Sequence, residues 1–328
     1  MLAEIPITPW HWIGFVAAVL VFLTLDLGVF HRKAHVVKFR EALSWTIVWI
    51  CLALLFASVV APALVSDWGK EQKTEFVTGY ILELSLSMDN VFVMAIIFSY
   101  FRIPNEYQHR VLFWGVLGAL IMRGLMIGVG TVLIHHVHGM LHVFGAFLVF
   151  TGIKMLYSGE EGVHPETNPV VRVARKLFPI SADYDGQKFV TFIDGRRVLT
   201  PLTVVLVMVE TTDLVFALDS IPAIFGVTQN PFIVFTSNVF AILGLRSLYF
   251  VLAGAIDYFR YLKIGLSVVL IFIGTKMLIA NWYKISTNLS LVVVAGILVM
   301  SMACSLLVAW REKRGKKSQP TGEHDSGA

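Results

Sequence analysis

The sequence is poor in charge, in cysteine and in the signatures of soluble enzymes. Only 15% of its 328 residues are charged, against about 25% in an ordinary soluble domain. Its two cysteines, Cys51 and Cys304, both lie in apolar runs, which excludes a disulfide framework and a CxxC redox motif. Walker, GxGxxG, HExxH and GxSxG motifs are all missing from the sequence. We therefore expect no ATP hydrolysis, no resident cofactor, no nucleic-acid partner and no enzymatic reaction.

Apolar residues are what the sequence has in excess. They make up 57% of the chain and give a mean hydropathy of +0.76, which is more apolar surface than one water-soluble globule can bury. Many apolar runs reach the roughly 18 residues that a helix needs to cross a bilayer. The sequence therefore predicts an all-α polytopic membrane helix bundle. Its nine expected spans are Trp12–Phe30, Leu43–Val65, Phe76–Tyr100, Val111–Ile134, Met140–Tyr157, Leu199–Phe225, Phe232–Ile256, Tyr261–Ile279 and Leu289–Ala309.

The basic residues outside these spans are distributed unevenly. Nineteen Lys and Arg residues lie in the tail and in the loops after spans one, three, five and seven, counting Lys263 at the edge of span eight, whereas only Lys70, Lys73 and Lys284 lie on the opposite side. The positive-inside rule then places the N-terminus outside and the C-terminus in the cytoplasm. Because Met1–Trp10 carries no Lys or Arg, we expect the first span to be retained rather than cleaved as a signal peptide.

Two sets of three spans resemble each other. Asp89-Asn-Val-Phe-Val in span three is echoed by Asp213-Leu-Val-Phe-Ala in span six, and Arg123 and Arg246 follow these acids at nearly the same distance. A nine-residue motif that ends in Lys-Met-Leu also occurs twice, as Leu148–Leu156 in span five and as Leu270–Leu278 in span eight. The two copies are identical at six positions. Because each copy has three helices, the two copies must cross the membrane in opposite directions. Such inverted repeats are typical of secondary transporters, whose substrate sites lie near the bilayer midplane.

The repeats divide the chain into six segments. The loop between the repeats predicts a short basic helix from Asn168-Pro169 to about Leu177 and a hairpin around Asp194-Gly195. This loop is either a gate or docking surface, or a connector that lies on the bilayer. The segments are an N-terminal two-helix segment (1–75), the first repeat (76–157), the cytoplasmic loop (158–198), the second repeat (199–279), the last transmembrane helix (280–310) and a disordered basic tail (311–328).

Ionisable residues inside the spans are the strongest chemical signal, because each is costly in a membrane unless it faces a cavity or a partner. Asp26, near the inner end of span one, is expected at the membrane interface. The others all lie in the repeats: Glu83, Asp89, Arg123, Lys154, Glu210, Asp213, Asp219, Arg246 and Lys276.

The acids of this group are expected to meet at a cation site. Glu210 and Asp213 are three residues apart and share a helix face, and Asp89 is the repeat equivalent of Asp213. Pro222 is expected to break or kink span six and to free backbone carbonyls near Asp219. Oxygen ligands of this kind suit a hard divalent cation such as Mn²⁺, Mg²⁺ or Ca²⁺. The predicted metal ligands are Asp89, Glu210, Asp213 and Asp219, with Glu83, Ser85, Ser87 and Asn90 beside them.

Two alternatives stay open at this point. The acids could instead be neutralised structurally, with Arg123 and Arg246 as charge-balancing partners, while Lys154 and Lys276 reach towards the membrane surface. A group of histidines near the outer ends of spans four and five is either structural or a metal-collecting vestibule. Its members are His135, His136, His138 and His142.

The acidic motifs carry a family resemblance. From about span one to span nine, the chain resembles the TerC family of integral membrane proteins, most closely its bacterial Alx-like branch. The matching segments are Glu83-Leu-Ser-Leu-Ser-Met-Asp-Asn-Val-Phe-Val93, Glu210-Thr-Thr-Asp-Leu-Val-Phe-Ala-Leu-Asp-Ser-Ile-Pro-Ala-Ile224, Phe235-Thr-Ser-Asn-Val-Phe-Ala-Ile-Leu-Gly-Leu-Arg246 and Gly274-Thr-Lys-Met-Leu278.

The resemblance has implications for location and function. It implies a protein of the bacterial inner (plasma) membrane that exports Mn²⁺ from the cytoplasm when manganese is in excess or the pH is alkaline. The leading hypothesis is a secondary transporter of a hard divalent cation, driven by a proton gradient. The alternative is a membrane scaffold, or a redox or tellurite-type stress modulator, whose acids are structural. The resemblance places the family's metal-site acids on Asp89, Glu210, Asp213 and Asp219, with Glu83 and Asn90 adjacent.

Cellular metal content separates these hypotheses. Deleting the gene of an exporter raises intracellular manganese under manganese load, whereas deleting a scaffold leaves it unchanged. We expect the deletion strain to accumulate manganese, as measured by elemental analysis of washed cells. An unchanged manganese content would favour the scaffold.

Overall fold

The computed structural model describes residues 7–25, 38–157, 172–173, 176, 178–193, 195–253 and 261–317. Long helices dominate this part of the chain, and the regular strands form a single hairpin. In chain order the elements are α1 (Pro9–Leu25), α2 (Phe39–Leu55), the π-helical turn η2 (Phe56–Val60), α3 (Ala61–Leu64), α4 (Lys70–Tyr100), α5 (Asn105–His136), α6 (Met140–Tyr157), β1 (Val190–Ile193), β2 (Arg196–Leu199), α8 (Pro201–Phe225), α9 (Pro231–Ala253), α10 (Leu262–Leu278) and α11 (Thr287–Lys317).

The predicted all-helical architecture is confirmed. Among the described residues, seven helices are long and apolar enough to cross a membrane, and they match the predicted spans two to seven and nine. Spans one and eight correspond to α1 and α10, which are each 17 residues long. The expected end of span one at Phe30, together with Asp26, lies outside the described residues.

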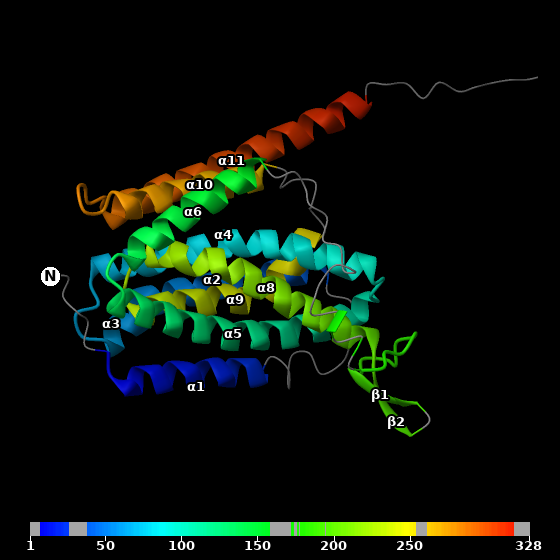
Figure 1. Ribbon diagram of the computed structural model, residues 1–328. Helices are drawn as coiled ribbons and strands as arrows, with labels where there is room; N and C mark the ends of the chain where they lie inside the picture. The colour runs from blue at the N-terminus through cyan, green and yellow to red at the C-terminus, as the bar shows by residue number, and fades with distance from the viewer. Residues whose placement is uncertain are drawn as a thin grey trace, which may run out of the picture.

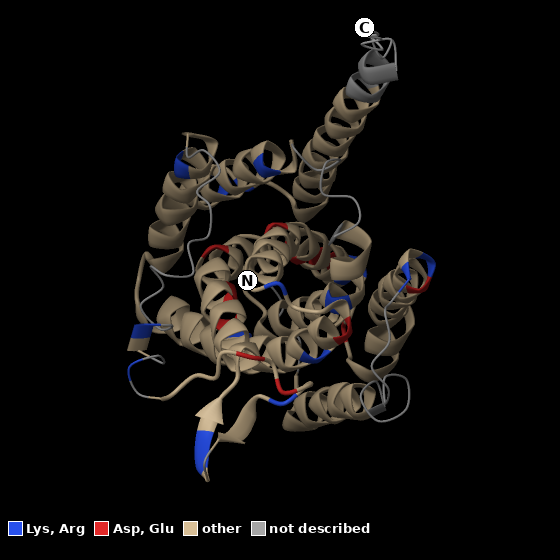
Figure 2. Cartoon of the chain, turned by 90° about the vertical axis from the view of Figure 1, so that its right-hand side faces the viewer, with Lys and Arg blue, Asp and Glu red and all other residues tan. Residues whose placement is uncertain are grey.

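The helices form a central group with further helices on both sides (Figure 1). In the centre α4 packs against α8 and α9, α5 packs against the same two helices, and α2 covers α9. On one side α6 pairs with α10, which in turn contacts α11. Helix α1 lies on the opposite side, against the aromatic side chains of Phe232 and Phe235 of α9. The end-on view of Figure 2 shows acidic residues on helices of the central group.

Glycines allow α6 and α10 to approach closely. A Cβ atom on Gly274 of α10 would lie 2.6 Å from the carbonyl oxygen of Gly145, and one on Gly152 of α6 would lie 2.8 Å from the carbonyl oxygen of Ser267. Small residues at such contacts let two backbones pack directly. The contact is reciprocal, because each helix places a glycine against the backbone of the other.

The hairpin predicted around Asp194-Gly195 is confirmed, although Asp194 itself lies outside the described residues. β1 and β2 pair antiparallel, with Ile193 opposite Arg196, and Gly195 has a positive φ of 75°, which glycine adopts without strain. The hairpin region docks on the membrane helices, since Tyr184 donates a hydrogen bond of 2.7 Å to the carbonyl oxygen of Phe101. Most of the short helix predicted between Asn168 and Leu177 lies outside the described residues.

Two predictions about helix ends need correction. Helix α8 is not broken at Pro222 but continues to Phe225. Proline lacks one backbone N–H group and so removes one helical hydrogen bond, and here that loss falls in the last turn, where the helix is about to end. Helix α11 continues to Lys317, beyond the predicted end at Ala309, so that the expected disordered tail (311–328) begins inside a helix. Residues 318–328 lie outside the described part.

The α6–α10 contact yields a stability prediction. Gly274→Ala should destabilise the folded protein by about 1–3 kcal/mol, because the added methyl group meets backbone atoms that cannot turn away. Gly128→Ala on α5 is the matched control, since its Cβ would meet nothing within 4 Å. It should be neutral or slightly stabilising, as alanine favours helix over glycine. Thermal unfolding in detergent compares them, and equal stability of the two variants would contradict the packing account.

Candidate functional site

Three charged side chains meet in the interior of the helix bundle. Arg123 of α5 lies between Glu83 of α4 and Asp213 of α8, and all three residues are at most 3% exposed. The guanidinium of Arg123 forms an ion pair with Glu83 through Nη1. It also donates to Asp213, with 3.1 Å from Nη2 to Oδ1 and 3.5 Å from Nε to Oδ2. One side chain therefore joins the consecutive helices α4 and α5 to α8, which lies much later in the sequence.

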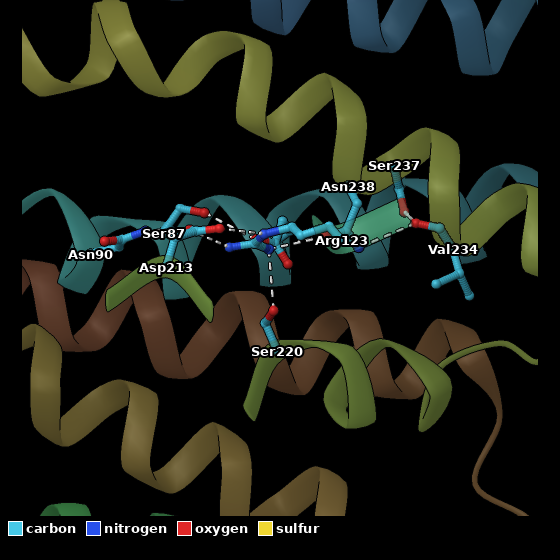
Figure 3. A network of polar contacts seen from close by, with 9 residues as sticks. Ser87, Asn90, Arg123, Asp213, Ser220, Val234, Ser237 and Asn238 are labelled. Atoms are coloured by element: carbon cyan, nitrogen blue, oxygen red, sulfur yellow. Dashed lines mark hydrogen bonds and ion pairs between the residues drawn. The ribbon is translucent and has the colours of Figure 1, made fainter. Parts of the chain in front are cut away.

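Uncharged polar groups complete this network (Figure 3). Asn90 of α4 donates from Nδ2 to Asp213 Oδ1 at 2.6 Å, and Ser87 donates to Glu83 Oε1 at 3.1 Å. Arg123 Nη1 further donates to Ser220 Oγ at 3.2 Å and to Asn238 Oδ1 at 3.1 Å. We call this network, formed by Glu83, Ser87, Asn90, Arg123, Asp213, Ser220 and Asn238, the central cluster.

The central cluster holds more acceptors than donors. With both acids ionised, Glu83 and Asp213 carry two negative charges against the one positive charge of Arg123. Glu83 Oε2 and Asn90 Oδ1 are both buried and have no hydrogen-bond partner among the described residues. Buried oxygens without a donor are costly, so the cluster has the chemistry of a place that accepts a further cation or proton donor.

A small cavity adjoins the central cluster. Its volume is about 30 Å³, which is enough for a water molecule. Asp89 of α4 and Asp219 of α8 line it, together with Arg123 and Ser220 of the central cluster, and the rest of its wall is apolar: Leu86, Met155, Phe216, Leu266 and Leu270. We call it the acidic cavity. Thr151 of α6 hydrogen-bonds to Asp219, and Lys154 on the same helix acts electrostatically on that acid.

Glu210 lies elsewhere. It packs against α5 at Gly118, where even a single added Cβ atom would overlap its carboxylate. The helix geometry explains the separation: at 100° per residue, Glu210 and Asp219 are nine residues apart and so point to opposite sides of α8. Asp213, three residues from Glu210, lies about 60° from it around the helix; the two acids interact electrostatically, and Asp213 points towards α4 and α5.

The structure therefore divides the predicted metal site. Within the part of the chain that the structure describes, no three Asp, Glu, His or Cys side chains are grouped closely enough to hold a metal ion. The expected convergence of four acids is not seen. Asp213, Glu83 and Asn90 belong to the central cluster, Asp89 and Asp219 to the acidic cavity, and Glu210 to neither. The histidines near the outer ends of spans four and five form no such group either; one of them, His142, contacts Asn281 at 3.1 Å.

The other predicted charges are also separated. Arg246 lines a different small cavity with Phe22, Trp49 and Phe113, so the two repeat-equivalent arginines have different surroundings. Lys276 interacts electrostatically with Glu75. The carboxylate of Glu75 also accepts a 2.7 Å hydrogen bond from Thr228. Glu75 was outside the predicted span because α4 begins six residues earlier, at Lys70. Lys154 is exposed on α6.

Sequence reasoning missed two polar members of the central cluster. Asn238 is fully buried, donates from Nδ2 to the carbonyl oxygen of Val234 at 3.2 Å and so presents its own Oδ1 to Arg123. Ser220 is likewise buried and accepts from the same guanidinium. The sequence did contain a signal for Asn238, namely an asparagine inside an apolar span. A polar side chain is retained in a membrane helix only when it has a partner, so this asparagine indicated a buried polar contact. Ser85, in contrast, donates to its own helix at Ile81 and takes no part.

A bundle of membrane-length apolar helices around a buried acid–arginine cluster defines a multi-pass integral membrane protein. The chain belongs to the integral membrane protein TerC family, whose family model matches residues 68–316. A Myxococcus xanthus protein, "Uncharacterized membrane protein STKORF319", is 51% identical over 300 residues, which cover 92% of this chain and 93% of that protein. "Putative membrane-bound redox modulator Alx" of Escherichia coli K12 is 45% identical over 312 residues, covering 94% and 97%. No solved structure matches the chain.

The two groups of acids should respond differently to neutralisation. Asp213→Asn or Glu83→Gln leaves Arg123 short of a buried partner and should cost about 3–5 kcal/mol of stability. Asp89→Asn, in the acidic cavity, should cost less than about 1 kcal/mol. Thermal unfolding in detergent, with membrane abundance as a second readout, measures both. Equal losses for Asp89→Asn and Asp213→Asn would contradict this division.

Proposed function

We propose that the chain is a secondary transporter that exports a hard divalent cation, with Mn²⁺ as the expected substrate, from the cytoplasm in exchange for protons. In this proposal the chain is a carrier and performs no enzymatic reaction. The observation that carries it is the acidic cavity: two carboxylates, Asp89 and Asp219, face one small space inside a bundle of membrane helices. Acids in such a place are rarely retained without a cation or proton to bind.

The chemistry of the acidic cavity suits the proposed substrate. Asp89 and Asp219 supply carboxylate oxygens and Ser220 supplies a hydroxyl oxygen, and Mn²⁺ prefers such hard ligands. Two carboxylates would balance the charge of one divalent ion. A cavity of about 30 Å³ has room for a bare ion or a single water, which favours a cation that sheds much of its hydration shell.

The helix arrangement supports an inverted repeat of α4–α6 and α8–α10. If a two-fold axis relates the two sets, corresponding helices must contact one another reciprocally. The α6–α10 contact has this property. Gly152 meets Ser267 and Ile271, while its repeat equivalent Gly274 meets Gly145 and Val149. Adding 122 to the residue number converts Gly152 to Gly274, and the same shift converts the partners of Gly274 to those of Gly152. Transporters built in this way bind substrate at the repeat interface.

The proposed orientation defines which helix ends face the cytoplasm. The excess of Lys and Arg in the tail and in the loops after spans one, three, five and seven favours a cytoplasmic C-terminus. Helix α4 would then run from the outside at Lys70 to the cytoplasm at Tyr100, and the β1–β2 hairpin would lie on the cytoplasmic side. We place the protein in the bacterial inner membrane, in line with its bacterial relatives.

A redox or scaffold function is the second candidate, and the name of the E. coli relative favours it. Such a role would leave Asp89 and Asp219 as structural groups. The two described cysteines, Cys51 and Cys304, are free and exposed on α2 and α11. A transport measurement on purified protein separates this candidate from the first.

Transport by reconstituted protein tests the proposal. Liposomes that contain a manganese-sensitive dye should take up Mn²⁺ when the wild-type protein is present, and faster when a pH gradient is imposed. Asp89→Asn and Asp219→Asn should each slow uptake at least about tenfold, since losing even an indirect metal contact is commonly worth that much. Asp183→Asn, an exposed acid in the loop before β1, should transport normally. Undiminished uptake by both cavity variants would overturn the assignment of the acidic cavity.

A further inference from the structure

We propose that Arg123 sets the cation affinity of the acidic cavity: its fixed positive charge keeps binding weak enough for the cation to leave. This inference rests on the proposed transport function and gives a role to a residue that is neither a ligand nor merely a structural partner. The cavity wall contains Asp89, Asp219 and Arg123 together, so a cation held by the two acids has a guanidinium as its neighbour.

The geometry holds Arg123 firmly in this position. Glu83 and Asp213 bind the guanidinium from two different helices, and Ser220 and Asn238 bind the same Nη1 atom. A nitrogen of a guanidinium end carries two hydrogens, whereas three acceptors surround Nη1. The acceptor surplus means that the positive charge remains in place when one of these contacts is lost.

The charges of the two groups are coupled through this side chain. At the low effective dielectric of a protein interior, like charges repel strongly over short distances. A divalent cation in the acidic cavity is therefore attracted by Asp89 and Asp219 and repelled by Arg123. A site with two carboxylates and no such neighbour would hold the ion more tightly and release it more slowly, and conduction or transport requires that a bound ion can leave.

The repeat provides an internal comparison. Arg246, which follows Asp213 as Arg123 follows Asp89, lines a cavity whose other side chains are Phe22, Leu23, Trp49, Phe113, Val116 and Leu243. No acid is among the described residues that line that cavity. Only one arginine of the pair thus stands beside the proposed cation position, and Arg246 is the matched control.

The test measures Mn²⁺ binding and Mn²⁺ transport in the same variants. Binding to purified protein is followed by calorimetry, and transport is followed in liposomes. Arg123→Gln should tighten binding by about tenfold or more, which is the change expected from losing one short-range charge interaction, while it slows transport. Arg123→Lys keeps the charge, so its affinity should stay within about threefold of the wild type. Arg246→Gln should also leave the affinity within about threefold.

A folding defect does not obscure the outcome. If Arg123→Gln fails to accumulate, the double variant Glu83→Gln with Arg123→Gln removes the ion pair as a unit, which buried pairs often tolerate. Glu83 does not line the acidic cavity, but its charge is lost together with that of Arg123, so the double variant should bind Mn²⁺ more tightly than the wild type by a smaller factor than Arg123→Gln alone. Unchanged or weaker binding in whichever of these variants folds would overturn the role of Arg123. A wild-type protein that neither binds nor transports Mn²⁺ would instead overturn the proposed function, and this inference with it.

Discussion

The cost of holding ionised groups inside a membrane is the constraint on which the rest of this structure depends. A buried charge is tolerated only with a partner, and Arg123 is the partner of both Glu83 and Asp213. Because these three residues come from α5, α4 and α8, satisfying their charges fixes how the three helices pack. Asn238 brings α9 into the same network through its contact with the guanidinium. The polar centre therefore organises helices whose outer faces are almost uniformly apolar.

The same constraint gives the two groups of acids different tasks. In the central cluster the carboxylates are engaged by Arg123, and their burial at 3% exposure or less makes them parts of the scaffold. In the acidic cavity Asp89 and Asp219 line a small space of about 30 Å³ and are the groups that we propose as cation ligands. Arg123 belongs to both, and in our proposal its single charge links the stability of the bundle to the cation affinity of the cavity. The proposed transporter would benefit from such a link, since it must bind its substrate without trapping it.

Much of the fold could be predicted from the sequence, because hydropathy and turn chemistry are local properties. The long spans, the Asp194-Gly195 hairpin and the presence of buried acids all follow from short stretches of residues. The grouping of the acids could not be predicted so well. Glu210 and Asp213, three residues apart, do lie close enough to interact electrostatically, but the helix phase turns Asp219 to the side of α8 opposite Glu210, towards α6. Which face of α8 meets which neighbour depends on tertiary packing, and Asn238 and Ser220 enter the site for the same reason.

Locating a bound cation tests the central claim most directly. Crystals of the wild-type protein grown with Mn²⁺, with diffraction data collected on both sides of the manganese absorption edge, would reveal the ion by its anomalous signal. The account predicts one strong peak in the acidic cavity, within coordination distance of Asp89 and Asp219 and beside the guanidinium of Arg123. A peak found only elsewhere, such as among the histidines between α5 and α6, with Asp89 and Asp219 touching no ion, would contradict it.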